Sequence, residues 1–316
     1  MKIGIPKALL YFRYHRLWEA FFDALQTEYV VSADTNKQIL AEGTRLSIDE
    51  ACLSSKIFMG HVQYLLDKCD AVLIPRIGSF GRDGTVCTRF QALYDLTANT
   101  FPQARLLALN MESAGGRREK QAFLELGAAL GKSRAASSRA YRQASSLYQL
   151  EQRSAVAEER KKLLSPQVKI LVVAHHYNIF DRYVGAPILD YLKGLGAVPV
   201  LADVTDYPST IADAPRLSET LPWEYNRHLT GAVWQLKDQV DGILMVSSFP
   251  CGPDSMINEI LTRRVHGIPM MTLVIDGQEG TAGMETRLES FLDIIHFKQG
   301  GAHGEKRSDV PAAGSR

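Results

Sequence analysis

Short apolar runs alternate with longer amphipathic stretches along most of this chain, and no other feature constrains its fold as strongly. Within residues 2–109, four apolar runs of strand type are separated by stretches that place apolar residues at helical spacing. The same pattern resumes at residue 168 and continues to residue 295. Strands that alternate with helices build parallel sheets whose faces the helices cover. The sequence therefore predicts the α/β class, with two Rossmann-like domains that each contain a parallel sheet.

A stretch of different composition separates the two patterned regions. Residues 114–165 are dominated by Ala, Arg, Glu, Gln, Leu and Ser and contain no proline, which predicts one long helix or two consecutive helices. We expect this helical segment to join the domains, either as a brace between them or as a face for a partner. The expected organisation is an N-terminal α/β domain (1–113), a helical connector (114–166), a C-terminal α/β domain (167–298) and a tail (299–316). The tail offers little to bury, so we expect it to be disordered.

Composition and charge narrow the function classes. The 316 residues are 46% hydrophobic and 22% charged, as in ordinary globular proteins. A net charge of +1 gives no basis for a nucleic-acid partner or for an anionic membrane surface. No run approaches the roughly 18 apolar residues that span a bilayer. The first residues resemble a strand entering a turn, not a signal peptide. We therefore expect a cytoplasmic protein.

Four widely spaced cysteines, Cys52, Cys69, Cys87 and Cys251, are too few for a disulfide framework. In a reducing compartment such cysteines indicate metal binding, catalysis or packing. Cys69 directly precedes a predicted strand with no loop chemistry around it, so we interpret it as structural. The other three cysteines each lie at a junction between a predicted strand and a predicted helix.

The clearest of these junctions surrounds Cys251, in the motif Phe-Pro-Cys-Gly-Pro-Asp. A strand-like run, residues 242–248, leads into the motif, and a helix-like run, residues 255–265, leads out of it. The two prolines and the glycine interrupt regular structure. The carboxyl ends of parallel strands are where α/β sheets bind ligands. A helix N-terminus also favours a thiolate or an anionic cluster, so Cys251 is a candidate ligand.

Three thiolates contributed by two domains would suit an iron–sulfur cluster. The candidate ligands are Cys52, Cys87 and Cys251. A [4Fe-4S] cluster held by three cysteines would leave one iron open to substrate, water or another ligand. Zinc with a histidine as the fourth ligand is the rival, and simple packing of the thiols is the third alternative. The sequence contains no Cys-x-x-Cys pair, so the spacing allows the three thiols to converge without requiring it.

Three further residues are weaker candidates for tuning a cluster or holding an anionic group. His176 stands beside His175 at the end of a predicted strand, where a histidine ligates a metal, exchanges protons or hydrogen-bonds a turn. Arg76 follows another strand and would hold an anionic group. Glu279 lies in a glycine-rich turn, where a carboxylate does acid–base work or simply starts a helix. His61 is more typical of a capping or core-edge histidine.

Several familiar fingerprints are missing. No Gly-x-Gly-x-x-Gly follows the first strand, and the phosphate-binding pattern Gly-x-x-x-x-Gly-Lys-Ser/Thr does not occur. The Gly-x-Ser-x-Gly pattern of serine nucleophiles is also missing. We therefore do not expect an intrinsic ATPase or a dinucleotide enzyme.

Several segments of the chain resemble one known family. They are Lys2–Leu9, Glu50–Cys52, Ile74–Arg76, His176–Asn178, Phe249–Ser255 and Ala282–Glu289. The family is the 2-hydroxyacyl-CoA dehydratase activase-related group, also called CoA protein activase, a domain of unknown function. It is similar to the subunits of 2-hydroxyacyl-CoA dehydratases and to double-cubane cluster proteins of anaerobes. This chain has Ser54 where the family pattern leads us to expect the proline of Cys-Leu-Pro.

The resemblance implies an iron–sulfur protein with a [4Fe-4S] or larger cluster, in which Cys52, Cys87 and Cys251 match the family's cysteines. It implies low-potential electron transfer or radical dehydration of an acyl-CoA. The implied partners are an ATP-dependent activase, a dehydratase-like subunit and a second copy of the chain in a dimer. The protein would be either a lyase of the dehydratase type or an accessory redox protein. The alternative is a metal-free or zinc-containing module that binds a small anionic ligand.

Overall fold

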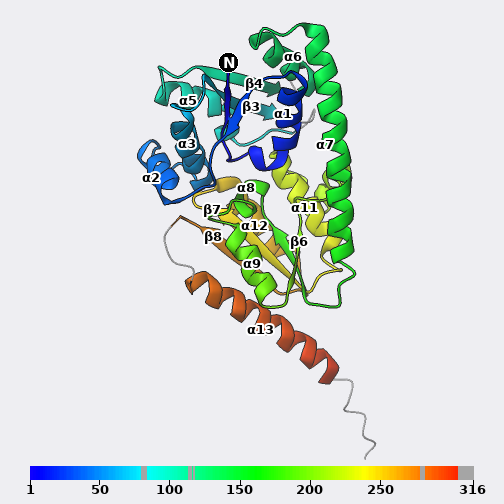
Figure 1. The fold of residues 1–316 in the computed structure, drawn as a ribbon. Helices are drawn as coiled ribbons and strands as arrows, with labels where there is room; N and C mark the ends of the chain where they lie inside the picture. Colours follow the sequence, from blue (N-terminus) through cyan, green and yellow to red (C-terminus); the bar gives the residue numbers. More distant parts are fainter. Residues whose placement is uncertain (80–83, 113–115, 117, 278–281, 305–316) are drawn as a thin grey trace, which may run out of the picture.

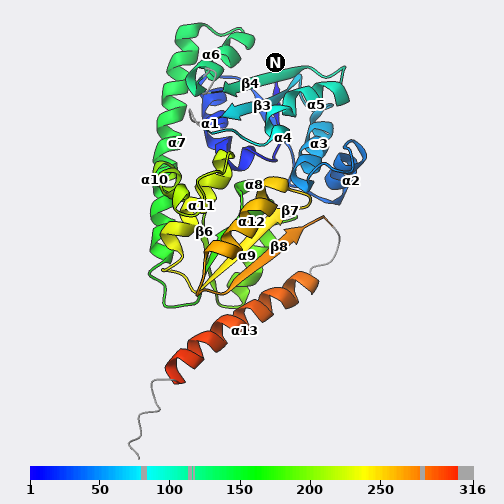
Figure 2. The ribbon, with the colours of Figure 1, turned by 180° about the vertical axis from the view of Figure 1, so that it is seen from behind.

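The computed structural model describes residues 1–79, 84–112, 116, 118–277 and 282–304. These residues form two four-stranded sheets in which all neighbouring strands run parallel (Figures 1 and 2). The strand orders are β2-β1-β3-β4 and β6-β5-β7-β8, so the two sheets share one topology. The predicted α/β class with two Rossmann-like domains is confirmed.

The first domain is built around the sheet β2-β1-β3-β4. Its strands are β1 (Ile3–Ile5), β2 (Tyr29–Val31), β3 (Ala71–Ser79) and β4 (Leu106–Glu112). Its helices are α1 (Tyr11–Ala24), α2 (Lys37–Arg45), α3 (Leu53–Leu65), α4 (Thr88–Gln91) and α5 (Leu93–Thr100). Apolar side chains from strands and helices meet in one core, in which Ile3, Phe21 and Phe58 are almost fully buried. This burial is what the alternating pattern of the sequence predicts.

Two glycines fix the position of α3, the helix that Cys52 precedes. A Cβ atom on Gly43 in α2 would lie 1.9 Å from the carbonyl oxygen of Lys56, and one on Gly60 would lie 1.9 Å from that of Ile39. Only glycine allows the backbones of α2 and α3 to approach this closely. The two helices therefore form one tightly packed pair at the edge of the first domain.

The connector consists of two consecutive helices, α6 (Glu119–Ala129) and α7 (Arg134–Lys162). In the first domain α7 packs against α1 through the buried Ala140 and Ala144. Near its end, the carboxylate of Glu159 accepts a hydrogen bond of 2.9 Å from the backbone N–H of Leu201 in the second domain. Figures 1 and 2 both show α7 running along one side of the molecule past both sheets. The helix therefore contacts both domains.

The second domain is built around the sheet β6-β5-β7-β8. Its strands are β5 (Lys169–Val173), β6 (Val198–Leu201), β7 (Gly242–Ser248) and β8 (Met270–Ile275). Its helices are α8 (His176–Ile179), α9 (Ala186–Gly194), α10 (Tyr207–Asp213), a 3-10 turn (Ala214–Arg216), α11 (Glu224–Leu236), α12 (Gly252–Arg264) and α13 (Ala282–Gly304). Side chains of α9 and α13 form one core cluster with the sheet, and side chains of α11 and α12 form another. The sheet is thus covered on both faces.

The last helix is longer than predicted. The sequence places a helix over residues 286–295 and a disordered tail from residue 299, but α13 extends from Ala282 to Gly304. Two side chains near its end contact the body of the domain. The Gln299 amide donates to Asp241 Oδ1 over 3.1 Å, and the Lys298 amine donates to the carbonyl of Gly267 over 3.4 Å. These contacts attach the end of α13 to the second domain, although the composition of this segment provides no apolar face for packing.

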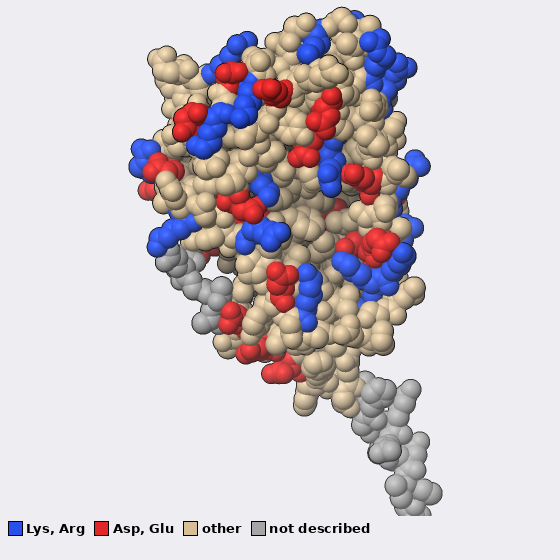
Figure 3. Space-filling view, viewed as in Figure 1, with Lys and Arg blue, Asp and Glu red and all other residues tan. Residues whose placement is uncertain are grey.

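Charged side chains of both signs are interspersed on the face shown in Figure 3. This distribution agrees with the net charge of +1. Among the helices that the structure describes, none is both long enough and apolar enough to cross a membrane.

His61 lies in the core and not at its edge. The side chain is fully buried, with Nδ1 2.7 Å from Ser32 Oγ and Nε2 2.9 Å from Thr35 Oγ1. Thr35 donates its own proton to Asp181 of the second domain. Because the Thr35 hydroxyl has already donated its proton, its oxygen accepts a hydrogen bond from Nε2–H. Nδ1 then accepts from the Ser32 hydroxyl, so the neutral imidazole pairs with both hydroxyl groups. Burial and the charge of Lys7 lower the pKa of His61 to about 4.

This buried histidine should make the protein sensitive to acid. Between pH 6.5 and 4 the unfolded chain binds a proton at His61 that the folded protein does not, so stability falls as the pH drops through this window. The full effect is about 3 kcal/mol. Urea unfolding at pH 7 and pH 4 should show a smaller loss of stability for His61→Gln than for the wild type. The control is His266→Gln, at an exposed position, which should lose as much stability between pH 7 and pH 4 as the wild type. If His61→Gln also loses as much as the wild type, the acid sensitivity does not come from His61.

Candidate functional site

Each of the three candidate cysteines directly precedes a helix. Cys52 is the N-cap of α3, Cys87 that of α4 and Cys251 that of α12. All three have extended backbones and partly exposed side chains. The thiols therefore lie beside the free N–H groups of three first turns, where a negative charge is favoured.

The start of α3 is held against the loop that contains Cys251. The backbone N–H of Leu53 donates to the carbonyl oxygen of Phe249 over 2.9 Å. One residue further on, Ser54 donates to Asn178 Oδ1 over 2.8 Å and lies 2.7 Å from the hydroxyl of Ser248. All three of these polar side chains are buried. These bonds connect the residue after Cys52 in the first domain to the end of β7 in the second.

The loop that precedes Cys87 is attached to the second domain in a different way. The backbone of Thr85 exchanges two hydrogen bonds with the segment before α11, one from Thr85 N–H to Pro222 (3.0 Å) and one from Glu224 N–H back to Thr85 (2.8 Å). After Cys87, the ring of Phe90 packs edge-on against that of Tyr177, with 5.9 Å between centroids. Cys87 is thus fixed between two contacts with the second domain.

The three cysteines share two neighbours, Tyr177 and Asp254. Burial raises the pKa of Tyr177 well above its usual range, and the charges of Asp254 and of all three cysteines raise it further. Asp254 likewise contributes to the raised pKa of each thiol. The structure therefore brings Cys52, Cys87 and Cys251 into one neighbourhood at the interface between the domains.

Asp254, in the first turn of α12, connects this neighbourhood to His175. Its Oδ1 atom lies 2.9 Å from His175 Nε2 and accepts a hydrogen bond of 3.0 Å from the Asn226 amide. Burial opposes the charge of both groups, yet their mutual attraction raises the pKa of His175 and lowers that of Asp254. The imidazole ring of His175 also stacks on Tyr177, with centroids 5.1 Å apart. Both shifts favour the charged form of the pair, an imidazolium beside a carboxylate.

The thiols themselves are poor acids in the metal-free protein. Burial raises the pKa of Cys87 to about 11, helped by the charges of Cys52 and Asp254. Burial and Asp254 raise the pKa of Cys251, and burial raises that of Cys52. All three are consequently protonated near neutral pH. Within the described residues, no three His, Cys, Asp or Glu side chains are gathered around a point that one metal ion would occupy.

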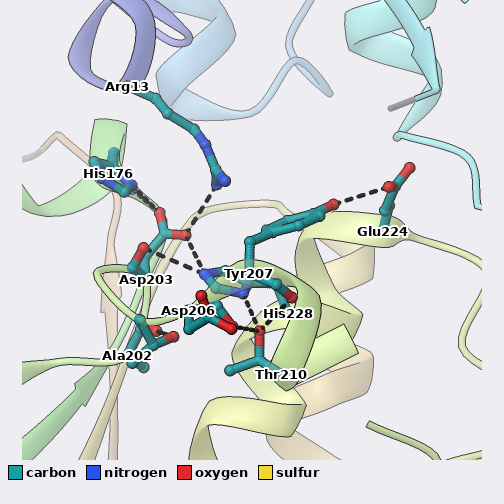
Figure 4. A network of polar contacts seen from close by, with 10 residues as sticks. Arg13, His176, Ala202, Asp203, Asp206, Tyr207, Thr210, Glu224 and His228 are labelled. Atoms are coloured by element: carbon teal, nitrogen blue, oxygen red, sulfur yellow. Dashed lines mark hydrogen bonds and ion pairs between the residues drawn. The ribbon is translucent and has the colours of Figure 1, made fainter. Parts of the chain in front are cut away.

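His176 takes part in a separate buried network, shown in Figure 4. Its backbone N–H and its Nδ1 both contact Asp203 Oδ2, the former at 2.8 Å. The guanidinium of Arg13 in α1 reaches Asp203 from the first domain, with 3.4 Å between Nη1 and Oδ1. His228 lies on the other side of the carboxylate, with Nε2 also 3.4 Å from Oδ1. Despite burial, these neighbours lower the pKa of Asp203.

The remaining candidates lie apart from the thiols or outside the described residues. Arg76 is exposed on β3, where it pairs with Asp95 at 3.4 Å and donates to the carbonyl of Gln91 at 3.2 Å. The sulfur of Cys69 donates to the carbonyl of Leu65 at 3.2 Å inside the first domain. Glu279 belongs to the residues that the structure does not describe. Sequence reasoning noted His175 and His176 together at a strand end but kept only His176 among the site candidates. It missed Tyr177, Asn226 and the partnership of Asp254.

The coupling between Asp254 and Cys251 can be tested by thiol chemistry. Asp254→Asn removes the negative charge that raises the pKa of Cys251, so the thiolate fraction should increase. We expect iodoacetamide to alkylate Cys251 several-fold faster at pH 8 in the metal-free variant than in the metal-free wild type, as located by mass spectrometry. The exposed Asp190→Asn is the matched control. An unchanged rate at Cys251 would show that the carboxylate does not act on this thiol.

Comparison with known proteins gives one family. Residues 2–204 match the family described as the CoA enzyme activase uncharacterised domain. The match starts at the first strand, contains Cys52 and Cys87, and ends one residue after Asp203. No curated protein matches the chain. The matched segment is well over half of the 316 residues, and the chain therefore belongs to the CoA enzyme activase uncharacterised domain family.

Proposed function

We propose that this protein is a redox protein that holds an iron–sulfur cluster of the [4Fe-4S] type through Cys52, Cys87 and Cys251. The observation that carries the proposal is that three cysteines from two domains each lie at the start of a helix, and that contacts join these starts. Leu53 after Cys52 is hydrogen-bonded to the loop of Cys251, and Phe90 after Cys87 packs on Tyr177. Membership of the CoA enzyme activase family supports a role in the chemistry of CoA enzymes.

The donor set is the one that an iron–sulfur cluster uses, because cysteine thiolates are its usual ligands. Cys52 and Asp254 oppose ionisation of Cys87, and a cationic partner, either a cluster or zinc, would offset them. Binding would release protons from the thiols.

The residues around the thiols have definable tasks. When bound, an iron–sulfur cluster supplies one-electron transfer at low potential. The raised pKa of Tyr177 keeps its phenol protonated, and its partly buried ring packs against Phe90 beside the thiols. His175 offsets the charge of Asp254, so that the carboxylate does not add an uncompensated negative charge beside Cys251. Three first-turn sets of N–H groups would stabilise negative charge on the sulfurs.

We favour electron transfer over complete catalysis. His175 and Asp254 are buried and hydrogen-bonded to each other, and this pairing suits a charge-compensating role beside the thiols. An accessory role fits an ATP-dependent activase and a dehydratase-like subunit as partners, with a dimer of this chain as one assembly. Direct dehydration of an acyl-CoA through an open iron remains the enzymatic alternative, and it would require a substrate group to approach the same thiols.

Anaerobic purification tests the proposal directly. The wild type should contain about four irons and four acid-labile sulfides per chain and show a broad visible absorption that dithionite bleaches. The variant Cys52→Ser/Cys87→Ser/Cys251→Ser should lose iron, sulfide and colour while keeping its far-ultraviolet circular dichroism. Cys69→Ser is the matched control and should keep all three.

The same experiment separates the alternatives. A colourless, iron-free protein after anaerobic reconstitution would overturn the cluster. Stoichiometric zinc in that protein would identify a zinc module, and its absence would leave a metal-free module for a small anionic ligand. If the cluster is present, incubation with a 2-hydroxyacyl-CoA and the reductant distinguishes the two roles. A dehydratase converts this compound into an enoyl-CoA and water, whereas an electron carrier leaves it unchanged.

A further inference from the structure

A cavity of about 760 Å³ lies between α7 and the second domain, apart from the cysteines. α1 and α7 contribute its walls on one side, and the segment from Asp203 to Pro208 contributes the other. Its size falls within the range of small-molecule sites. The cavity therefore lies at the junction of three parts of the chain that are far apart in sequence.

Aromatic rings and a guanidinium form its inner wall. Tyr14, Tyr148 and Tyr207 line the cavity together with Arg13. The rings of Tyr14 and Tyr148 pack at 5.8 Å, and the Arg13 guanidinium lies 5.1 Å from the centre of the Tyr207 ring (Figure 4). Arg13 is held in place by Asp203. Rigid, flat groups of this kind offer a surface on which a planar ring can stack.

The acidic residues of the lining are already engaged. Glu119 accepts a hydrogen bond of 2.6 Å from the hydroxyl of Tyr141. Asp203 is shared among His176, His228 and Arg13. Asp206 caps α10 and accepts from the backbone N–H of Ser209 over 3.2 Å. Glu119 and Asp203 therefore direct their charge into the protein, while the exposed Asp206 is engaged only with the backbone of its own helix.

Two basic residues of the lining are not engaged. Arg153 and Arg160 are exposed on α7 and line the cavity, and the structure records no ion pair or hydrogen bond of either side chain within its described part. They are seven residues apart, which places them on one face of the helix and about 10 Å apart along its axis. The mouth of the cavity thus presents two unneutralised guanidinium groups beside an aromatic wall. Guanidinium groups bind phosphate through paired hydrogen bonds.

We propose that this cavity binds a nucleotide-sized organic phosphate, with its planar ring against the tyrosines and its phosphates on Arg153 and Arg160. The volume, the aromatic wall and the two exposed arginines about two helical turns apart together favour an elongated anion with a flat group. The site does not involve the phosphate-binding loops whose patterns are missing from the sequence. It also does not depend on the cysteines.

Isothermal titration of the full chain with ADP, without magnesium, tests the site. We expect saturable binding of one ADP, and affinity at least tenfold weaker in Arg153→Ala/Arg160→Ala, because each exposed guanidinium contributes a charge-assisted contact. Arg139→Ala/Arg142→Ala is the matched control, since it removes two exposed arginines of the same helix that do not line the cavity. The control should bind like the wild type.

Smaller probes test the two halves of the ligand. Adenosine and inorganic phosphate should each bind at least tenfold more weakly than ADP, because each engages only one part of the cavity. The proposal is overturned if ADP does not bind, if Arg153→Ala/Arg160→Ala binds it with wild-type affinity, or if inorganic phosphate binds as tightly as ADP. The variant lacking Cys52, Cys87 and Cys251 should bind ADP normally, so failure of the cluster proposal and failure of this one are distinguishable.

Discussion

The hydrogen bond from Leu53 N–H to the Phe249 carbonyl is the contact on which the candidate site depends. It joins the first residue of α3 to the loop before α12, and so it places two helix N-termini from different domains beside each other. The buried side chains of Ser54, Asn178 and Ser248 form further hydrogen bonds between the start of α3 and the second domain. Each such bond adds only about 1 kcal/mol. Its loss would nevertheless leave buried polar groups unsatisfied, which costs more than the bond itself contributes.

The interface is also where the protein concentrates buried charge. Arg13 with Asp203, and His175 with Asp254, are ion pairs in which one partner would be costly to bury alone. Two of these four residues, Asp203 and Asp254, follow strands of the second sheet, at the edge where α/β proteins bind ligands. The Arg13–Asp203 pair is complete only when both domains are present, whereas His175 and Asp254 both belong to the second domain. Apolar packing alone would allow the two domains to shift relative to each other, whereas polar contacts between the domains are formed in only one arrangement.

Much of the fold follows from local pattern. The alternation of apolar runs predicts both parallel sheets, because each strand and each helix needs a partner face. The absence of proline predicts the helical connector, although it does not distinguish one helix from two; Gly131, which has a positive φ, separates α6 from α7. The end of α13 was not predictable, since Lys298 and Gln299 hold it through contacts with residues far away in the sequence.

The candidate site was predictable only in its parts. The setting of Cys251 between a strand and a helix is visible in the sequence, but its proximity to Cys52 results from the packing of two domains. His175 and His176 illustrate the limit. Adjacent residues at a strand end point in different directions, and only the structure shows that His175 contacts Asp254 while His176 contacts Asp203. The tyrosines of the α7 cavity carry no local signal, because an aromatic residue on a helix is usually part of a core.

The boundary of the family match has a consequence for how the second domain is built. The match ends at residue 204, just after β6, whereas the sheet order is β6-β5-β7-β8. A chain that stopped there would contain β5 and β6 only, and β5 would have an open edge of unpaired backbone groups where β7 belongs. Two strands are too few for a stable sheet, and an open edge invites pairing between molecules. The last two strands of the matched segment, β5 and β6, therefore depend on residues after 204 to complete their sheet.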